Sequence, residues 1–304
     1  MLFIDRPDGK KIRGRQALNA VMPYMMPGRN QSAVYYERDI DLENALRRVR
    51  AKNLETGEEL PSGPAGDRYS LFGLVLAAVV RTIALKPQLN RFIHGRALYQ
   101  RDRIALSFIV KQKLAEDAPE GSAKIFFEPG DGLDVVSRKV NDAIAYVRLM
   151  GEGGSGERIA KAAHSIPGGK AILIGAYRLL DRINLAPWAL LKTDPLYASA
   201  YFANLGSLGL DTPYHHLYEW GNASLFVVMG KLQQDVGRQG RFGSGHHFVN
   251  FKVTLDERIA DGLYFARAAS IFSRLLAKPE LLEMELDQAR TILLGEGEGG
   301  ENRA

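Results

Sequence analysis

The sequence predicts an α+β fold in which helices pack against a mixed sheet to form two layers. The predicted strands and helices come in runs and do not alternate strictly, which argues against a doubly wound parallel sheet. A strongly apolar helix is expected over residues 67–85, buried on most of its sides. An alternating apolar strand near residue 250 leads through a short polar turn into an amphipathic helix, which Pro279 ends.

The other elements follow from local patterns along the chain. Apolar runs bounded by charged or glycine-containing turns predict strands over residues 33–40, 91–99, 103–114, 124–128, 201–204, 224–230 and 247–255. Apolar positions at helical spacing predict helices over residues 133–150, 157–165, 171–191 and 263–278. Asp41 is a good N-cap for one more helix. The GEGGSG segment at 151–156 lies between helices, so it is interpreted as a linker and not as a phosphate-binding loop.

We expect one core domain over residues 1–294, with a basic N-terminal arm (1–15) and a flexible tail (295–304). The chain of 304 residues contains no cysteine, which excludes disulfides, thiolate metal sites and a cysteine nucleophile. No zinc-ligand spacing or nucleotide-binding glycine motif is present, so no metal is predicted.

Localisation is predicted from the apolar segments. The first 15 residues lack the apolar region of a signal peptide, and the longest apolar run, 71–80, is too short to span a membrane. We therefore expect a cytoplasmic protein without a transmembrane segment. The apolar stretch 171–191 carries three charged residues and predicts a buried or interfacial helix, with packing favoured over a peripheral membrane role.

The charge balance favours anionic partners. The formal net charge is +5, and cations cluster near residues 10–15, 47–52 and 91–103. Such clusters suit nucleic acid, acidic lipid or the phosphates of a cofactor such as coenzyme A. A solvated surface is the favoured interpretation of each cluster, and nucleic-acid binding is the weakest hypothesis.

The segment 256–262 is the strongest candidate for chemistry. Asp256, Glu257 and Arg258 form a compact polar turn after a strand, and Asp261 and Gly262 lead into a helix. On composition alone this is a salt-bridged turn with Asp261 as a helix N-cap. A strand, a charged turn and a packed helix also form a rigid platform for a reactive group.

This turn resembles the catalytic motif Asp-His-Arg-x-x-Asp-Gly of the acyltransferase core of 2-oxo-acid dehydrogenase complexes and of chloramphenicol acetyltransferase. Every fixed position is present except the histidine, whose place Glu257 occupies. Two distant segments support the resemblance: Pro-Gln-Leu-Asn at 87–90 and Ala-Asn-Leu-Gly at 203–206, which is similar to the Ser/Thr-Asn-Leu-Gly strand end of the family. The order and spacing match from about residue 13 to 282, and they imply a chloramphenicol-acetyltransferase-like fold.

The resemblance implies the roles of the site residues. The histidine of the family is the general base, so Glu257 stands where a base is expected, with Arg258 and Asp261 supporting the turn. A free glutamate has a pKa of roughly 4.3, so Glu257 could act as a base only in a dry pocket with Arg258 pointing elsewhere.

The oxyanion donor of the family is replaced as well. Ala203 occupies the place of the Ser or Thr, and loss of such a donor typically costs about 2.7–4 kcal/mol. Asn204, or the hydroxyl of Ser199 or Ser207, could compensate. The two replacements favour an altered or lost acyl transfer.

The resemblance also implies partners. The family forms trimers with active sites between subunits and a tunnel for a thiol substrate, so coenzyme A or acyl-coenzyme A and a homotrimer are expected. The chain contains no lipoyl or peripheral-subunit-binding domain, so a separate lipoylated protein or other acyl carrier would be needed. Whether the protein is an enzyme stays open: it is a coenzyme-A-linked acyltransferase-fold protein or, alternatively, a non-catalytic trimeric scaffold or assembly protein.

Two histidine pairs, at 215–216 and 246–247, remain as outside candidates for a displaced base. Adjacent side chains in a strand point to opposite faces, so neither pair chelates one metal easily. Turn or core histidines are the favoured interpretation, with His216 and His246 as the alternatives.

Overall fold

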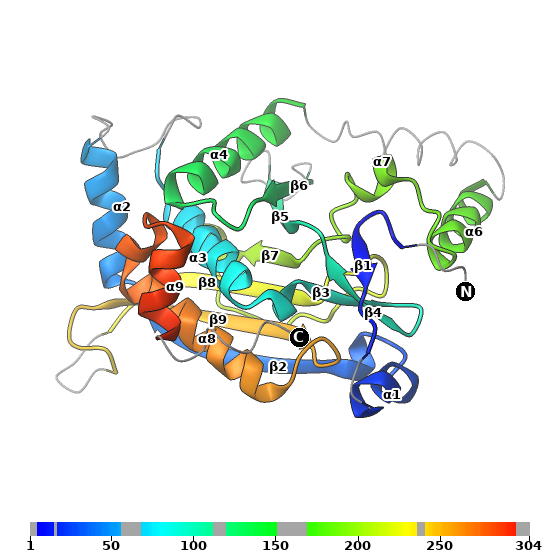
Figure 1. The fold of residues 1–304 in the computed structure, drawn as a ribbon. Coiled ribbons are helices and arrows are strands. Elements are labelled where there is room, and N and C mark those ends of the chain that lie inside the picture. The colour runs from blue at the N-terminus through cyan, green and yellow to red at the C-terminus, as the bar shows by residue number, and fades with distance from the viewer. Residues whose placement is uncertain are drawn as a thin grey trace.

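The chain folds around a six-stranded mixed sheet (Figure 1). The computed structural model describes residues 5–14, 17–55, 68–111, 120–150, 169–235 and 241–295. The order of the strands is β2-β9-β8-β7-β5-β6, and β7 runs parallel to both of its neighbours while the other pairs are antiparallel. The strands are β2 (Ala33–Asp41), β5 (Ile104–Lys111), β6 (Glu120–Phe127), β7 (Ala200–Asn204), β8 (Leu225–Gln234) and β9 (His247–Asp256).

Helices cover one face of this sheet and complete the predicted two layers (Figure 1). They are α2 (Glu43–Glu55), α3 (Leu71–Leu85), α4 (Leu133–Met150), α8 (Gly262–Ala277) and α9 (Leu286–Leu294). Helix α3 lies among α2, α4 and α8, which explains why nearly all of its residues are buried. It begins after Ser70, whose hydroxyl accepts a hydrogen bond from the backbone N–H of Gly73 (3.0 Å). Residues 68–70 are not helical, so the helix begins later than the predicted start at residue 67, which itself lies outside the described residues.

A three-stranded sheet lies beside the main one, in the order β1-β4-β3. Its strands are β1 (Gly9–Lys11), β3 (Arg91–His94) and β4 (Ala97–Arg101). The single strand predicted over 91–99 is therefore wrong: Gly95 and Arg96 have φ values of 52° and 72° and form the turn of a hairpin. Strand β1 comes from the segment predicted as a basic arm.

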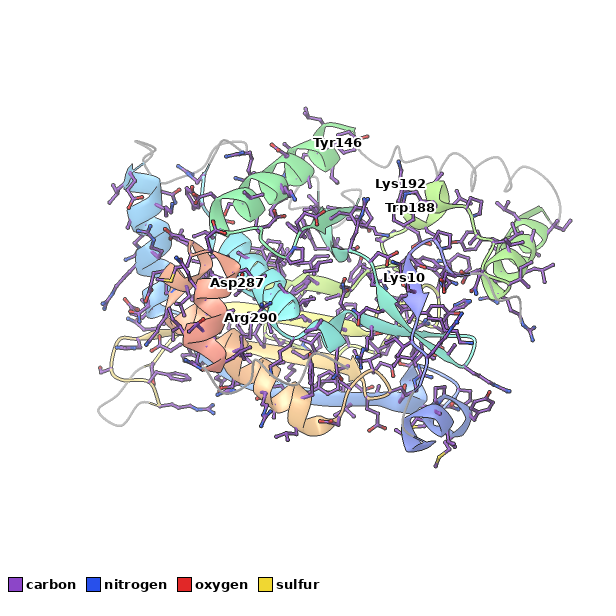
Figure 2. All side chains as sticks on the ribbon, viewed as in Figure 1. Lys10, Tyr146, Trp188, Lys192, Asp287 and Arg290 are labelled. Carbon is purple, nitrogen blue, oxygen red and sulfur yellow. The ribbon has the colours of Figure 1, made fainter. Side chains whose placement is uncertain are left out.

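The stretch predicted as one helix over 171–191 is two helices, α6 (Gly169–Arg182) and α7 (Trp188–Leu191). Asn184, with φ 65°, lies in the break between them. The ring of Tyr177 stacks on Trp220 (5.2 Å), yet much of the apolar surface of α6 is exposed, with Ile172 at 72% and Leu179 at 60%. Packing therefore buries only part of α6, contrary to the favoured expectation. Figure 2 shows Trp188 and Lys192 at α7.

The remaining elements are short. They are α1 (Ala17–Met25) and the 3-10 turns η1 (Asn30–Ser32), η2 (Pro87–Asn90), η3 (Leu205–Leu208) and η4 (Pro279–Leu282). None of the helices that the structure describes is long and apolar enough to cross a membrane. The glycine-rich linker at 151–156, the helix predicted over 157–165 and the tail at 296–304 lie outside the described residues.

Candidate functional site

A buried ion pair holds the turn that follows β9. The carboxylate of Asp256 accepts hydrogen bonds from Nη2 (2.6 Å) and Nε (2.8 Å) of Arg258. The backbone N–H of Arg258 and the hydroxyl of Ser32 also donate to it, each at 3.1 Å. The exposed fractions of Asp256 and Arg258 are only 0% and 6%. This bidentate pair fixes the direction in which the chain leaves the sheet.

The guanidinium group of Arg258 points away from Glu257, the first residue after β9. Its Nη1 donates to the carbonyl oxygens of Met26 (2.7 Å) and Pro27 (3.2 Å), which connects the turn to the segment after α1. The backbone N–H of Glu257 donates to the carbonyl of Ser32 (3.0 Å). The backbone of the turn is thus held while the Glu257 side chain stays out of the ion pair.

Asp261 caps α8, as the sequence predicts. Its side chain accepts a hydrogen bond from the backbone N–H of Tyr264 (2.8 Å), and Gly262 is the first helical residue. The helix therefore begins at a defined angle to β9. The structure brings Glu257, Arg258 and Asp261 together in one turn.

Glu257 is exposed and lies at a cavity of about 970 Å³. The cavity extends from the 257–262 turn between α8 and the strands β2, β8 and β9, and it reaches α3. Its inner walls are apolar and include Ile40, Val79, Ile83, Val227, Leu255 and Phe272. Pockets of this size with apolar walls and a few polar groups are typical of small-molecule sites.

Besides Arg258, which is paired with Asp256, three arginines line the cavity: Arg13, Arg38 and Arg91. Burial lowers the pKa of Arg91, whose Nε donates to the side-chain oxygen of Gln100 (3.3 Å). Guanidinium groups suit phosphate and carboxylate ligands. Arg13 and Arg91 belong to the basic clusters of the sequence, whereas Arg38 belongs to none of them, and no sequence pattern assigns the three arginines to a cavity.

Asn204 lies apart from the Glu257 turn. Its side-chain oxygen accepts a hydrogen bond from the backbone N–H of Ser207 (3.3 Å), so it caps η3. In the register of the sheet Asn204 lies level with Phe251 of β9. Phe251 is about 16 Å along the strand from the Glu257 turn, given the rise per residue of a strand. A single chain therefore does not bring Asn204 and Glu257 together.

The two serines that the resemblance suggests as alternative hydroxyl donors form other hydrogen bonds. The Ser207 hydroxyl donates to the carbonyl of Asn204 (2.8 Å). The buried Ser199 hydroxyl donates to Oδ1 of Asn90 (2.5 Å) and accepts from the N–H of Ala105 (2.9 Å). Asn90 ends the Pro-Gln-Leu-Asn segment, so this contact joins that segment to the residue before β7.

The histidine pairs lie in polar turns or against aromatic rings. His246 contacts Asp41 (2.8 Å) and His247 contacts Glu43 (2.9 Å). Both pairs lie at the end of β9 that is farthest from the Glu257 turn. His215 stacks on Phe226, and burial lowers its pKa.

His216 donates from Nδ1 to the carbonyl of Leu217 (2.9 Å). Within the part of the chain that is described, neither pair forms a hydrogen bond or ion pair with Glu257. No group of three or more histidine, aspartate or glutamate side chains among the described residues is placed to hold a metal ion.

Several solved acyltransferase structures share this fold. The cubic core of a pyruvate dehydrogenase multienzyme complex is 14% identical, with a TM-score of 0.56 over 90% of this chain and 95% of that chain. The dihydrolipoamide acetyltransferase of Azotobacter vinelandii is 14% identical, with a TM-score of 0.55 and the same coverage. A chloramphenicol acetyltransferase is 12% identical, with a TM-score of 0.50 over 89% of this chain and 98% of that chain.

The chain therefore has the α+β fold of the chloramphenicol-acetyltransferase-like acyltransferase cores, as the sequence predicts. At identities this low the likeness concerns the fold alone. Neither the scan against known protein families nor the search of curated proteins gave a match.

Proposed function

We propose that the protein binds an acyl thioester, such as acyl-coenzyme A or an acyl group on a separate lipoylated or other carrier, beside the Glu257 turn. Acyl transfer at this site is altered or lost. The observation that carries the proposal is the cavity of about 970 Å³ that reaches Glu257 in a fold shared with acyltransferases.

The geometry meets one of the two conditions for Glu257 to act as a base. Arg258 is turned away and satisfied by Asp256 and by main-chain carbonyls. The second condition is a dry environment, and in the single chain Glu257 is exposed to solvent. An active site at this position therefore requires a second surface that covers the carboxylate.

A second copy of the chain is the proposed source of that surface. Asn204 and Glu257 lie far apart in one chain, so a site that uses both must combine two copies. The pyruvate dehydrogenase core is itself a cubic assembly of chains with this fold. We therefore infer a homotrimer with sites between subunits. Light scattering coupled to size-exclusion chromatography tests this inference, and a monomer at all concentrations would contradict it.

Coenzyme A is the proposed cofactor, with the cavity arginines Arg13, Arg38 and Arg91 as candidates for its phosphates. Calorimetric titration of the full chain with coenzyme A and an acyl-coenzyme A measures this binding directly. A thiol-release assay then tests transfer. If wild type and Glu257→Gln are equally inert with a broad panel of donors and acceptors, Glu257 is not a catalytic residue.

A non-catalytic trimeric scaffold is the second candidate. It is favoured by the solvent exposure of Glu257 and by Ala203 at the position of the oxyanion hydroxyl. This alternative predicts a stable trimer that binds neither coenzyme A nor acyl-coenzyme A. The same titration separates the two candidates, because only the first predicts saturable binding.

A further inference from the structure

The shape of the cavity indicates what kind of acyl group it accepts. We propose that this group is a long hydrocarbon chain, which lies between α8 and the sheet with its thioester end near Glu257. The inference rests on the proposed function, since it names the substrate class of that same site. Four features carry it: the small residues on α8, the apolar walls, the length of the space and the position of its charges.

Helix α8 leaves room for the cavity because most of the residues that it contributes to the lining are small, Phe265 and Phe272 being the exceptions. Gly262, Ala266, Ala269 and Ser273 all line the cavity and recur at helical spacing along one face. The other face of the helix is anchored, since Ile271, Leu275 and Leu276 are buried in the core. One face of α8 is thus anchored in the core, while the face with the small residues leaves room for the cavity.

Strand β2 forms the facing wall. Val34, Tyr36, Arg38 and Ile40 alternate along the strand and line the cavity, so they lie on the face of the sheet that α8 covers. Ile40 is buried, whereas Val34 and Tyr36 are 40% and 38% exposed. Val34 and Tyr36, which lie nearer the Glu257 turn, therefore remain accessible to solvent, whereas Ile40 packs in the core.

The length of the space suits a chain better than a compact group. From Gly262 to Ser273 the cavity follows α8 for about 16 Å, given the rise per residue of a helix. Its walls beyond the turn are mostly aliphatic and aromatic. Protein interiors are normally close-packed, so wall atoms beside an open space lack contacts that a hydrocarbon chain would supply.

The charges lie where a thioester head group would need them. Arg13 and Glu257 lie near the exposed end of the cavity, and Arg91 of β3 lines it as well. Arg38 pairs with Phe251 in the register of the sheet, so it lies about 16 Å along the strand from the turn and not at this end. An anionic head group beside Arg13 would therefore leave its hydrocarbon chain in the apolar interior.

The test is a chain-length series. Titration calorimetry measures the affinity of the full chain for coenzyme A and for acetyl-, hexanoyl-, octanoyl-, decanoyl- and dodecanoyl-coenzyme A, each below its micelle-forming concentration. Burial of a methylene should strengthen binding about fourfold until the cavity is full.

Equal affinity for acetyl- and dodecanoyl-coenzyme A would overturn the inference but leave acyl-thioester binding intact. Absence of binding by every thioester would overturn the proposed function. Displacement of a fluorescent fatty acid by free dodecanoate measures whether the cavity binds a hydrocarbon chain that carries no thioester. If dodecanoate binds and the thioesters do not, the apolar site stands and the proposed function fails.

Two substitutions locate the binding site. Ala269→Phe fills the middle of the cavity, so the dodecanoyl and acetyl compounds should bind within about twofold of each other, with coenzyme A unaffected. Ser270→Phe is the matched control, because Ser270 is exposed on the same helix and outside the cavity lining. The control should keep the full chain-length dependence.

If Ala269→Phe fails to fold, Ala266→Phe at the exposed part of the same face makes the same test. Circular dichroism and the thermal midpoint identify folded variants. A folded Ala269→Phe or Ala266→Phe protein that keeps the chain-length dependence of wild type would contradict the proposed location.

Discussion

Asp256 is the residue on which the geometry of the site depends most. Its carboxylate is fully buried and pairs with the nearly buried guanidinium of Arg258. Asp256→Asn leaves that cation without its charge partner, so the free energy of unfolding should fall by roughly 3–5 kcal/mol. Denaturant titration measures the change. Glu257→Gln is the control, since an exposed substitution in the same turn should change stability by no more than about 0.5 kcal/mol.

The proposed chemistry of the site depends on two other residues. If Glu257 and Ala203 are the reason for altered transfer, the double variant Glu257→His, Ala203→Ser should raise thiol release from an acyl-coenzyme A on the order of 10²-fold or more. The activity should rise with pH near the usual histidine pKa of about 6.5. Glu257→Ala with Ala203→Ser is the control that lacks a base. Equal rates in both variants would show that the Glu257 position does not limit transfer.

Lys124 makes the stability of the fold depend on pH. Burial, reinforced by Arg101, lowers the pKa of Lys124 from 10.5 to about 7. Its Nζ donates to the carbonyls of Leu191 (2.6 Å) and Asp194 (3.0 Å). Between pH 7 and 10.5 the unfolded chain binds more protons at this site than the folded chain, so this residue makes stability rise with pH. Denaturation midpoints of wild type and Lys124→Met across that range test this, and parallel curves would contradict it.

At the scale of elements, α8 joins the proposed site to the core. Its N-cap, Asp261, belongs to the same turn as Glu257, and its first residue, Gly262, lines the cavity. Asp261→Ala should destabilise the protein by about 1 kcal/mol, whereas Asp261→Asn keeps a capping oxygen and should cost less. Thermal unfolding of the two variants measures the difference. Equal losses would show that the carboxylate contributes by charge and not as a cap.

Helices and strands whose apolar residues recur at a clear period could be predicted from the sequence. The helix over 133–150 is confirmed as α4, and the strand predicted over 247–255 is confirmed as β9, which ends at Asp256. The hairpin was missed because the prediction placed Gly95 and Arg96 inside one strand, although an isolated glycine in a strand pattern signals a break in regular pairing; both residues have positive φ values. The helix α9 was missed as well, since the prediction assigned no element between Leu282 and the tail.

The candidate site was predictable only in part. The turn from Asp256 to Gly262 is local, so a motif could identify it. The separation of Asn204 from Glu257 depends on the order of strands in the sheet, which no short pattern encodes. The cavity was also missed, because small residues on a helix equally suit close packing against a neighbour.

At the scale of the whole molecule, the proposed trimer places a second copy over the Glu257 turn. Tyr35 lies beside that turn on the edge strand β2 and is 51% exposed. Tyr35→Glu should therefore weaken association and lower the mass measured by light scattering. Tyr146 on α4, 63% exposed, offers the control Tyr146→Glu, which should leave the mass unchanged (Figure 2). Loss of association in both variants, or in neither, would place the interface elsewhere.

The attachment of α6 has a consequence for the motions of the molecule. Arg6 pairs with Asp181 (2.8 Å) and Tyr177 stacks on Trp220, but most of the helix surface faces solvent. Helix α3, in contrast, is enclosed along nearly its whole length. Local opening needs less free energy where few apolar contacts break. The backbone amides of α6 should thus take up deuterium long before those of α3, so that one end of the molecule opens while the layer around the cavity remains closed.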